Sequence, residues 1–463
     1  MTRPPQDGAA PAAGWLARLG LGRPELRAWA MYDWAVSSLQ TTVMVAVFPI
    51  YFVKVAGAGG APMEASEALA YANTVALIVM TALSPLMGAV ADYFAVKKLM
   101  LAGFMLLGVA ACAGMFFVER GDLSMAWWLF VLALVGATGS LVPYEGLLPH
   151  IAPAHEVDRV STAAYAVGYI GGGLLLALNL TWIQKPEWFG MEPVATATGS
   201  AATLPARLAF LSVAAWWLVF SIPVLRRVRE PVRVLEPDEV AVAWSVRVPF
   251  QRLGETFREM RGYRNLFLML LAFMLYNDGI QTVIKMATSF GTEIGINQGV
   301  LIASILLVQF VGIPCTFVFG AIAARLGAKR GIFVGLWAYA LISILGYFMT
   351  SAAHFVALAC LVGLVQGGTQ ALSRSLFSSM VPPHKSGEFF GFFSVFEKFA
   401  GIFGPLLFGM MIRFSGSSRG AILSVIAFFA LGALLLWRVD EAAGQREARD
   451  HEEGLLTTPA GGA

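Results

Sequence analysis

Two short stretches of the 463-residue chain decide its fold: residues 88–98 read GAVADYFAVKK, and residues 320–330 read GAIAARLGAKR. Each follows a long apolar run, begins with a glycine and ends with two basic residues. Gly88 and Gly320, their first residues, lie 232 residues apart, and their last residues have the same separation. The chain is therefore expected to consist of two similar halves.

Composition indicates that these halves lie in a membrane. Hydrophobic residues make up 58% of the chain and charged residues 13%, with a mean hydropathy of +0.71. An average soluble domain carries about 25% charged residues, so this composition excludes a disordered protein and argues against a soluble enzyme. A membrane-spanning helix needs about 20 apolar residues, and twelve of them would need roughly 240. The chain has room for twelve spans and their loops.

Apolar runs of sufficient length give twelve candidate spans. Their expected limits are 32–53, 69–91, 98–118, 125–147, 160–182, 207–225, 265–290, 299–321, 330–350, 355–378, 388–412 and 420–437. With the N-terminus in the cytoplasm, 23 basic residues fall in cytoplasmic segments, six fall on the opposite side and three lie inside spans. Because cytoplasmic loops are enriched in Lys and Arg, this asymmetry predicts a multi-pass protein of the inner (cytoplasmic) membrane with both termini cytoplasmic.

The longest polar insert lies between the sixth and seventh spans and divides the chain. The expected order is a cytoplasmic N-terminal tail (1–28), a six-helix bundle (29–225), a cytoplasmic linker (226–264), a second six-helix bundle (265–438) and a disordered cytoplasmic tail (439–463). Within the linker, Phe250, Leu253, Phe257 and Met260 share one helical face. This pattern fits an amphipathic helix on the membrane surface and, equally, a solvated linker helix.

The expected fold is an all-α integral membrane protein, with twelve transmembrane helices in two pseudo-symmetric six-helix bundles. Two parallel six-helix repeats joined by a cytoplasmic loop are typical of secondary transporters that work by alternating access. In such proteins the binding site lies between the two halves.

The first stretch is similar to the signature loop between spans two and three of the major facilitator superfamily, in which Gly-x-x-x-Asp precedes basic residues. The matching residues are Gly88, Asp92, Lys97 and Lys98. Tyr93 and Ala95 depart from the usual pattern, and in the second copy Ala324 takes the position of the aspartate. The assignment to the superfamily therefore depends on the repeat, the topology and the loop together.

Five further stretches resemble one branch of that superfamily, the vacuolar amino-acid effluxers linked to autophagy and their bacterial relatives. They are AMYDWA (30–35), YAVGYIGGGL (165–174), YNDGIQTVI (276–284), GGTQALSRSL (367–376) and EFFGFFSVFEKFAGIFGP (388–405). The resemblance implies the major facilitator fold and a central cavity lined by spans one, four, seven and ten. It also implies efflux of a small polar or zwitterionic solute such as an amino acid.

Polar residues within the seventh span are the first candidates for a substrate or ion pathway. Asn277, Gln281 and Lys285 step by four and share a helix face, with Asp278 near it. Charged side chains inside a bilayer usually face a cavity or a partner. Lys285 could meet a cargo carboxylate and Asp278 an amino group, or the two could form a structural pair. Their seven-residue step rises about 10 Å, which is long for a direct salt bridge and favours the functional interpretation.

The tenth span offers a second polar stripe, again in steps of four: Gln366, Gln370 and Arg374. The Arg374 guanidinium suits a carboxylate or phosphate, although it could instead reach the headgroups from the helix end. Asp33, at the start of the first span, could couple transport to a proton or sit in the interface between its aromatic neighbours. Lys398, in the eleventh span, completes the candidate pathway.

A second group of residues is expected to gate the pathway. It consists of Gly88, Asp92, Lys97 and Lys98 in the first loop, Arg325, Lys329 and Arg330 in its repeat, and Glu145 at the end of the fourth span. Glu145 and Arg374 occupy equivalent positions, 229 residues apart, at the ends of facing bundles. Their opposite charges could form a salt bridge that closes the halves together.

The sequence carries no sign of an enzyme or of a bound cofactor. It has no HExxH, Walker A or dinucleotide motif, and its three cysteines and five histidines make no ligand spacing, so no metal site is expected. The expected partners are a small-molecule substrate, a coupling proton and the lipid bilayer, with the chain as a monomer. Thirty-two basic against 29 acidic residues argue against a nucleic-acid partner. Two alternatives stay open: another cargo, such as a drug, sugar or lipid, and a receptor or assembly factor that does not transport.

Overall fold

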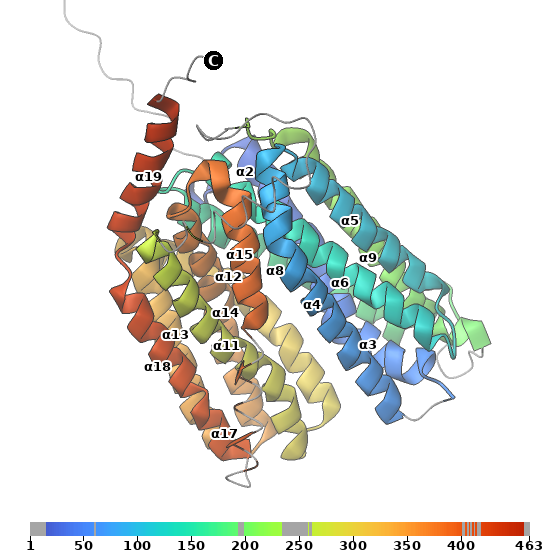
Figure 1. Cartoon of the computed structure of the whole chain (residues 1–463). Helices are drawn as coiled ribbons and strands as arrows, with labels where there is room; N and C mark the ends of the chain where they lie inside the picture. The colour runs from blue at the N-terminus through green and yellow to red at the C-terminus, as the bar shows by residue number, and fades with distance from the viewer. Residues whose placement is uncertain are drawn as a thin grey trace, which may run out of the picture.

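The computed structural model describes residues 15–59, 62–192, 199–233, 262–400 and 418–457, together with residues 258, 403, 404, 407, 410, 411 and 413. Eleven helical segments of this described part are long and apolar enough to cross a membrane. With α15, which opens the predicted eleventh span, they form two six-helix bundles, and the expected all-α membrane fold of twelve helices is confirmed (Figure 1).

The first bundle begins with a span in four pieces and continues with five long helices. The pieces are α2 (Pro24–Ser38), η1 (Leu39–Ala46), α3 (Phe48–Tyr51) and η2 (Phe52–Ala56). The long helices are α4 (Pro62–Tyr93), α5 (Lys97–Gly114), α6 (Leu123–Gly146), α8 (Val157–Gln184) and α9 (Gly199–Arg227). Short helices are α1 (Trp15–Arg18), η3 (Met115–Phe117), α7 (Leu148–Ile151) and η4 (Pro186–Phe189). Pro49 lies where the π-helical η1 gives way to α3, since proline cannot donate the hydrogen bond of a continuing helix.

The second bundle repeats the arrangement. Its long helices are α11 (Arg264–Glu293), α12 (Gln298–Leu326), α13 (Ala328–Tyr347) and α14 (Ala352–Ser379). They are followed by η5 (Pro383–Lys385), α15 (Ser386–Phe399), α17 (Ser418–Ser424) and α18 (Ile426–Arg438). Each bundle encloses a separate hydrophobic core, one drawn from residues 21–228 and the other from residues 263–439. Each half therefore has its own core, and the contacts between the bundles determine how the two halves are held together.

Both halves begin and end on one side of the molecule, here called the terminal end, where α2 starts and α18 finishes (Figure 1). There α15 packs against α4 and α6, while α8 packs against α12 and α14. Away from the terminal end, the ribbons of the two halves diverge in Figure 1. The contacts between the bundles therefore gather at the terminal end.

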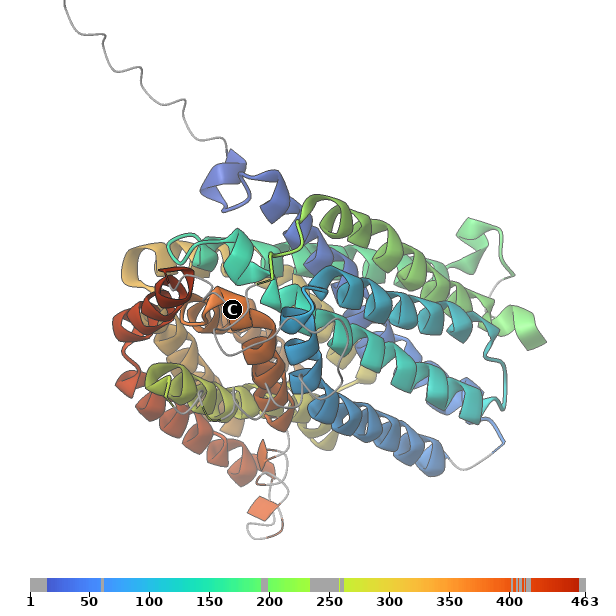
Figure 2. The ribbon, with the colours of Figure 1, turned by 45° about the horizontal axis from the view of Figure 1, so that its top comes forward.

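The tail after α18 differs from the sequence prediction. Residues 439–463 were expected to be disordered, but helix α19 (Glu441–Thr457) lies over the terminal end of the second bundle (Figure 2). Ala448 is buried, and the Gln445 amide donates to Ser379 Oγ and to Glu441 Oε1, each at 3.3 Å. The bond to Ser379, together with one from the Asn265 amide to Glu447 at 3.4 Å, ties to the bundle a helix that its composition alone would not predict. The predicted amphipathic helix at residues 250–260 lies outside the described residues, apart from Arg258.

Candidate functional site

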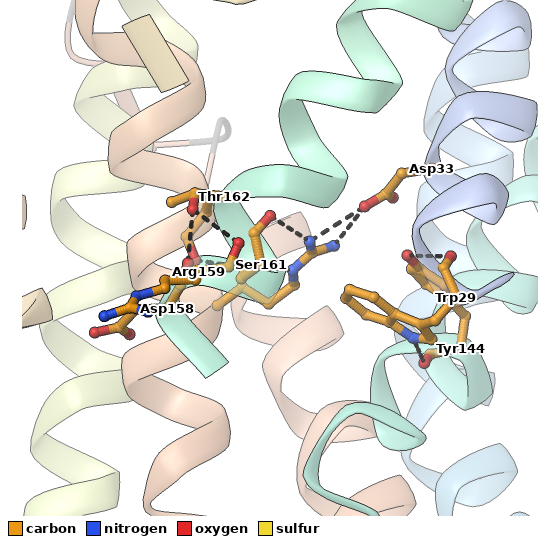
Figure 3. Close-up of polar contacts among 9 residues, drawn as sticks. Trp29, Asp33, Tyr144, Asp158, Arg159, Ser161 and Thr162 are labelled. Carbon is orange, nitrogen blue, oxygen red and sulfur yellow. Dashed lines mark hydrogen bonds and ion pairs between the residues drawn. The ribbon is translucent and has the colours of Figure 1, made fainter. Parts of the chain in front are cut away.

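A buried ion pair joins the two bundles near the terminal end. Arg374 on α14 donates from Nη1 and from Nη2 to the same Asp33 oxygen on α2, both at 3.2 Å. Arg374 Nε also donates to Ser161 Oγ at 3.0 Å, and Nη2 to the Ser161 carbonyl at 3.2 Å. Figure 3 shows Asp33 and Ser161, the two residues of the first half that accept these hydrogen bonds. Arg374 is only 2% exposed, so a side chain of the second half is held wholly by the first.

Aromatic rings complete the enclosure of this guanidinium. Its central carbon lies 4.9 Å from the ring centroid of Trp29 and 4.4 Å from that of Tyr165. Trp29 and Tyr144 exchange hydrogen bonds between side chain and carbonyl, at 3.0 and 3.1 Å, and their rings stack (Figure 3). A cation over desolvated aromatic faces is stabilised by their quadrupoles. The first half therefore forms a pocket of polar and aromatic groups around the Arg374 side chain of the second half.

This pairing differs from the expected closing salt bridge between Glu145 and Arg374. The structure pairs Arg374 with Asp33 on α2, and Ser161 on α8, which packs against α14, holds the same guanidinium. The carboxylate of Glu145 makes no ion pair with any described residue, although it lies within the electrostatic range of Glu397, Arg374, Asp33 and Lys398. Both side chains are buried inside the protein, and the Arg374 guanidinium points to Asp33 and Ser161. Lys398 pairs with its neighbour Glu397 at 3.1 Å.

Polar residues of α11 and α14 meet deeper in the second bundle. The Gln370 amide donates to Asn277 Oδ1 at 2.8 Å. Asp278 Oδ2 accepts a 2.9 Å hydrogen bond from the backbone N–H of Gly404, beyond the end of α15. Gln281 is half-buried on α11. Lys285 belongs to the same helix, but its side chain lies outside the described part, so its pairing with Asp278 stays a prediction.

The signature loop closes the other seam between the halves. Asp92 forms an ion pair with Lys97 and accepts a 2.8 Å hydrogen bond from the Glu388 N–H, in the first turn of α15. A carboxylate at a helix N-terminus is stabilised by the exposed N–H groups and the helix dipole. At Gly88, a Cβ atom would lie 2.1 Å from the Gly387 carbonyl oxygen, so the two helices approach more closely than any other residue would permit.

Further hydrogen bonds hold the start of α15 against the first half. Ser386 Oγ donates to the Gly146 carbonyl at 2.8 Å and lies 3.0 Å from His150 Nε2. Lys97 Nζ lies 3.4 Å from the same imidazole nitrogen. One polar network thus connects the signature loop, the end of α6 and the beginning of α15.

The repeat of this seam uses different chemistry. Ser161 Oγ donates to the Ala371 carbonyl at 2.7 Å, and Ser375 Oγ donates to Asp158 Oδ1 at 2.6 Å, so α8 is fastened to α14. Lys329 does not cross between the halves: its Nζ donates to the carbonyls of Trp437 and Val439, at 2.9 and 2.6 Å, at the end of α18. Arg325 and Arg330 are exposed. Of the basic residues of the second loop, Lys329 therefore acts within its own bundle.

Glu230, just after α9, contacts the signature loop in a way that the sequence did not reveal. Its carboxylate accepts from the backbone N–H groups of Lys97 and Lys98, at 2.7 and 2.8 Å, and so caps the start of α5. Burial raises the pKa of Glu230, although these two hydrogen bonds act in the opposite direction. No spacing in the sequence links a linker residue to a loop 132 residues earlier.

Ser161, Trp29 and Tyr165 were also missed. Tyr165 lies in a quoted stretch, but nothing in the sequence places it against Arg374. Among the described residues, no group of three His, Cys, Asp or Glu side chains could hold a metal ion. We call two contacts between the halves the latch: the Asp33–Arg374 pair and the hydrogen bond from the start of α15 to Asp92. Both would have to break for the halves to separate at the terminal end.

Comparisons with known proteins agree with this architecture. The family description "Vacuole effluxer Atg22 like" matches residues 59–449. An uncharacterized MFS-type transporter of Bacillus subtilis, YxiO, is 33% identical over 89% of the chain and 94% of its own length. Autophagy-related protein 22 of Yarrowia lipolytica is 28% identical over 64% of the chain, which spans about half (52%) of that relative's length.

Solved structures show the same fold at low identity. The proton:xylose symporter XylE matches 94% of the chain and 100% of its own with a TM-score of 0.64 and 14% identity. An outward-facing bacterial homologue of the iron transporter ferroportin matches 91% of the chain and 100% of its own, with a TM-score of 0.62 and 15% identity.

Proposed function

We propose, on the premise that the chain belongs to the Atg22-like vacuole effluxer family of major facilitator transporters, that it exports a small polar or zwitterionic solute, such as an amino acid, by alternating access. Secondary transport is the activity of its superfamily, and the chain is a multi-pass membrane protein and not an enzyme. The cargo and the direction are the parts that we propose.

The observation that carries the proposal is the buried Asp33–Arg374 pair between the bundles. A charge pair inside a bilayer is costly unless both charges are satisfied, and here each half supplies one charge. Separating the halves would strand both charges unless water, cargo or a proton replaces the partner. The pair therefore links opening at the terminal end to the arrival of something that can satisfy Asp33 or Arg374.

A proton is the coupling ion that we propose. The Asp33 side chain is 12% exposed, so water can reach it, and protonation would remove the negative charge that holds Arg374. Export could then be driven by a proton gradient.

The proposal is tested by counterflow in proteoliposomes loaded with unlabelled neutral amino acids, with a radiolabelled tracer outside. We expect tracer to accumulate above protein-free liposomes, and Asp33→Asn to remove the dependence of net transport on an imposed pH gradient. If no neutral amino acid shows counterflow while the protein binds another solute, the cargo class is wrong.

We also propose that the terminal end faces the cytoplasm of an inner-membrane protein, as the 23-to-six distribution of basic residues favours. A reporter protein that is active only in the cytoplasm should be active when fused after Leu235 and when fused after Ala443. A reporter that is active only in the periplasm should be inactive at both sites. A periplasmic signal at either site would contradict this orientation. With this orientation, the described contacts close the cytoplasmic side.

A further inference from the structure

A cavity of about 490 Å³ lies in the second bundle, away from the terminal end and apart from the latch. Helices α11, α12, α13, α14 and α17 line it, and Met44 and Val45 of η1 are its lining residues from the other half. Pockets for drug-sized ligands typically measure about 300–1,000 Å³. The cavity is therefore large enough for a whole small molecule.

The chemistry of its wall is apolar and uncharged. No charged residue is among the described side chains that line it. Three hydroxyl groups in the wall turn back on their own helices: Thr282 donates to the Asp278 carbonyl, Ser304 to that of Val300 and Ser343 to that of Tyr339, at 2.7–2.9 Å. Each hydroxyl proton is already used in a hydrogen bond within the helix, so these side chains offer no free donor to the cavity.

Two amides are the exception. Gln309 on α12 and Gln366 on α14 both line the cavity, and neither makes a hydrogen bond with a described residue. An amide offers both donors and an acceptor and carries no charge. A ligand in this cavity would meet two neutral hydrogen-bonding groups in an otherwise apolar wall.

We infer that this cavity is a binding site for an uncharged, mostly apolar small molecule with a neutral polar group that bonds Gln309 or Gln366. An ionised head would lose its hydration without a described counter-charge in the wall. The one buried guanidinium near α14's terminal end is already held by Asp33 and Ser161. This inference does not depend on the proposed amino-acid cargo, which would engage the charged groups between the halves.

The probe is N-phenyl-1-naphthylamine, a neutral dye that fluoresces in apolar surroundings and carries one N–H donor. Two variants on one helix form a matched pair: Ala359 lines the cavity, whereas Ala357 is exposed on the outer face of α14. Ala359→Phe should fill the site and weaken saturable binding at least tenfold. Ala357→Phe adds the same atoms outside and should bind as the wild type does. Since the detergent is common to both, their difference isolates the protein site.

Two further measurements sharpen the outcome. Gln366→Leu keeps the volume and removes the amide, so dye affinity should fall several-fold while the number of sites stays at one. Alanine, leucine and arginine at millimolar concentration should not displace the dye. Equal binding by the two Ala→Phe variants would overturn the site. Displacement of the dye by an amino acid would show that the cavity is not separate from the charged pathway. The experiments on the Asp33–Arg374 pair described below would not be affected by that result.

Discussion

Arg374→Met should destabilise the protein by about 3–5 kcal/mol and abolish transport, because it leaves the buried Asp33 carboxylate without its counter-charge. Thermal unfolding of the purified protein measures the first effect and counterflow the second. Arg227→Met, at an exposed position at the end of α9, is the matched control and should change neither.

The double variant separates the energetic from the functional role of the pair. Asp33→Leu with Arg374→Met removes both charges and should recover most of the lost stability, since no buried charge remains unpaired. Transport should stay absent, because nothing then couples separation of the halves to a ligand or proton. Transport at the wild-type rate in the double variant would mean that the pair is structural only.

Gly88→Ala should force the halves apart at the terminal end. Its Cβ atom would meet backbone atoms of Gly387 and Glu388, at 2.1–2.8 Å, and backbone cannot move aside as a flexible side chain can. Gly103→Ala is the control: its Cβ atom would have no neighbour within 4 Å, and replacing a helix glycine with alanine usually stabilises by about 0.5–1 kcal/mol.

Thiol labelling detects this opening. In a background without Cys112, Cys315 and Cys360, Ser84→Cys places a thiol at a fully buried position that faces Ser394 across the seam. Labelling of the cysteine at position 84 should be slow when no further change is made and when Gly103→Ala is added. It should be fast when Gly88→Ala is added. Slow labelling in all three would show that the close approach of α4 and α15 does not hold this end shut.

The sequence predicted the architecture because its signals are local. Apolar runs of bilayer length, the 232-residue repeat and the basic asymmetry each depend on composition within short windows or on a fixed offset. The tail was the exception: α19 is held by contacts with Ser379 on α14 and Asn265 on α11, which no local pattern reports.

The contacts of the site could not be predicted, because they join residues far apart in the chain. Asp33 and Arg374 are 341 residues apart, and Asp92 meets an N–H 296 residues later. The repeat offset suggested Glu145 as the partner of Arg374, because the two residues occupy equivalent helix ends. The offset does not say which helices of the two halves contact each other. The cavity could not be predicted for the same reason: it arises where five helices leave space, and most of its residues are ordinary apolar ones.

The central claim is that two bundles rock about a seam that the Asp33–Arg374 pair and the Asp92–α15 cap hold shut. Double electron–electron resonance in lipid nanodiscs tests it with two spin-label pairs at exposed sites, Leu99 with Leu326 at the terminal end and Trp188 with Phe348 at the other. Relative to the wild type, Gly88→Ala should lengthen the first distance and shorten the second. Distances that stay unchanged at both ends, or that change at one end alone, would contradict alternating access by these halves.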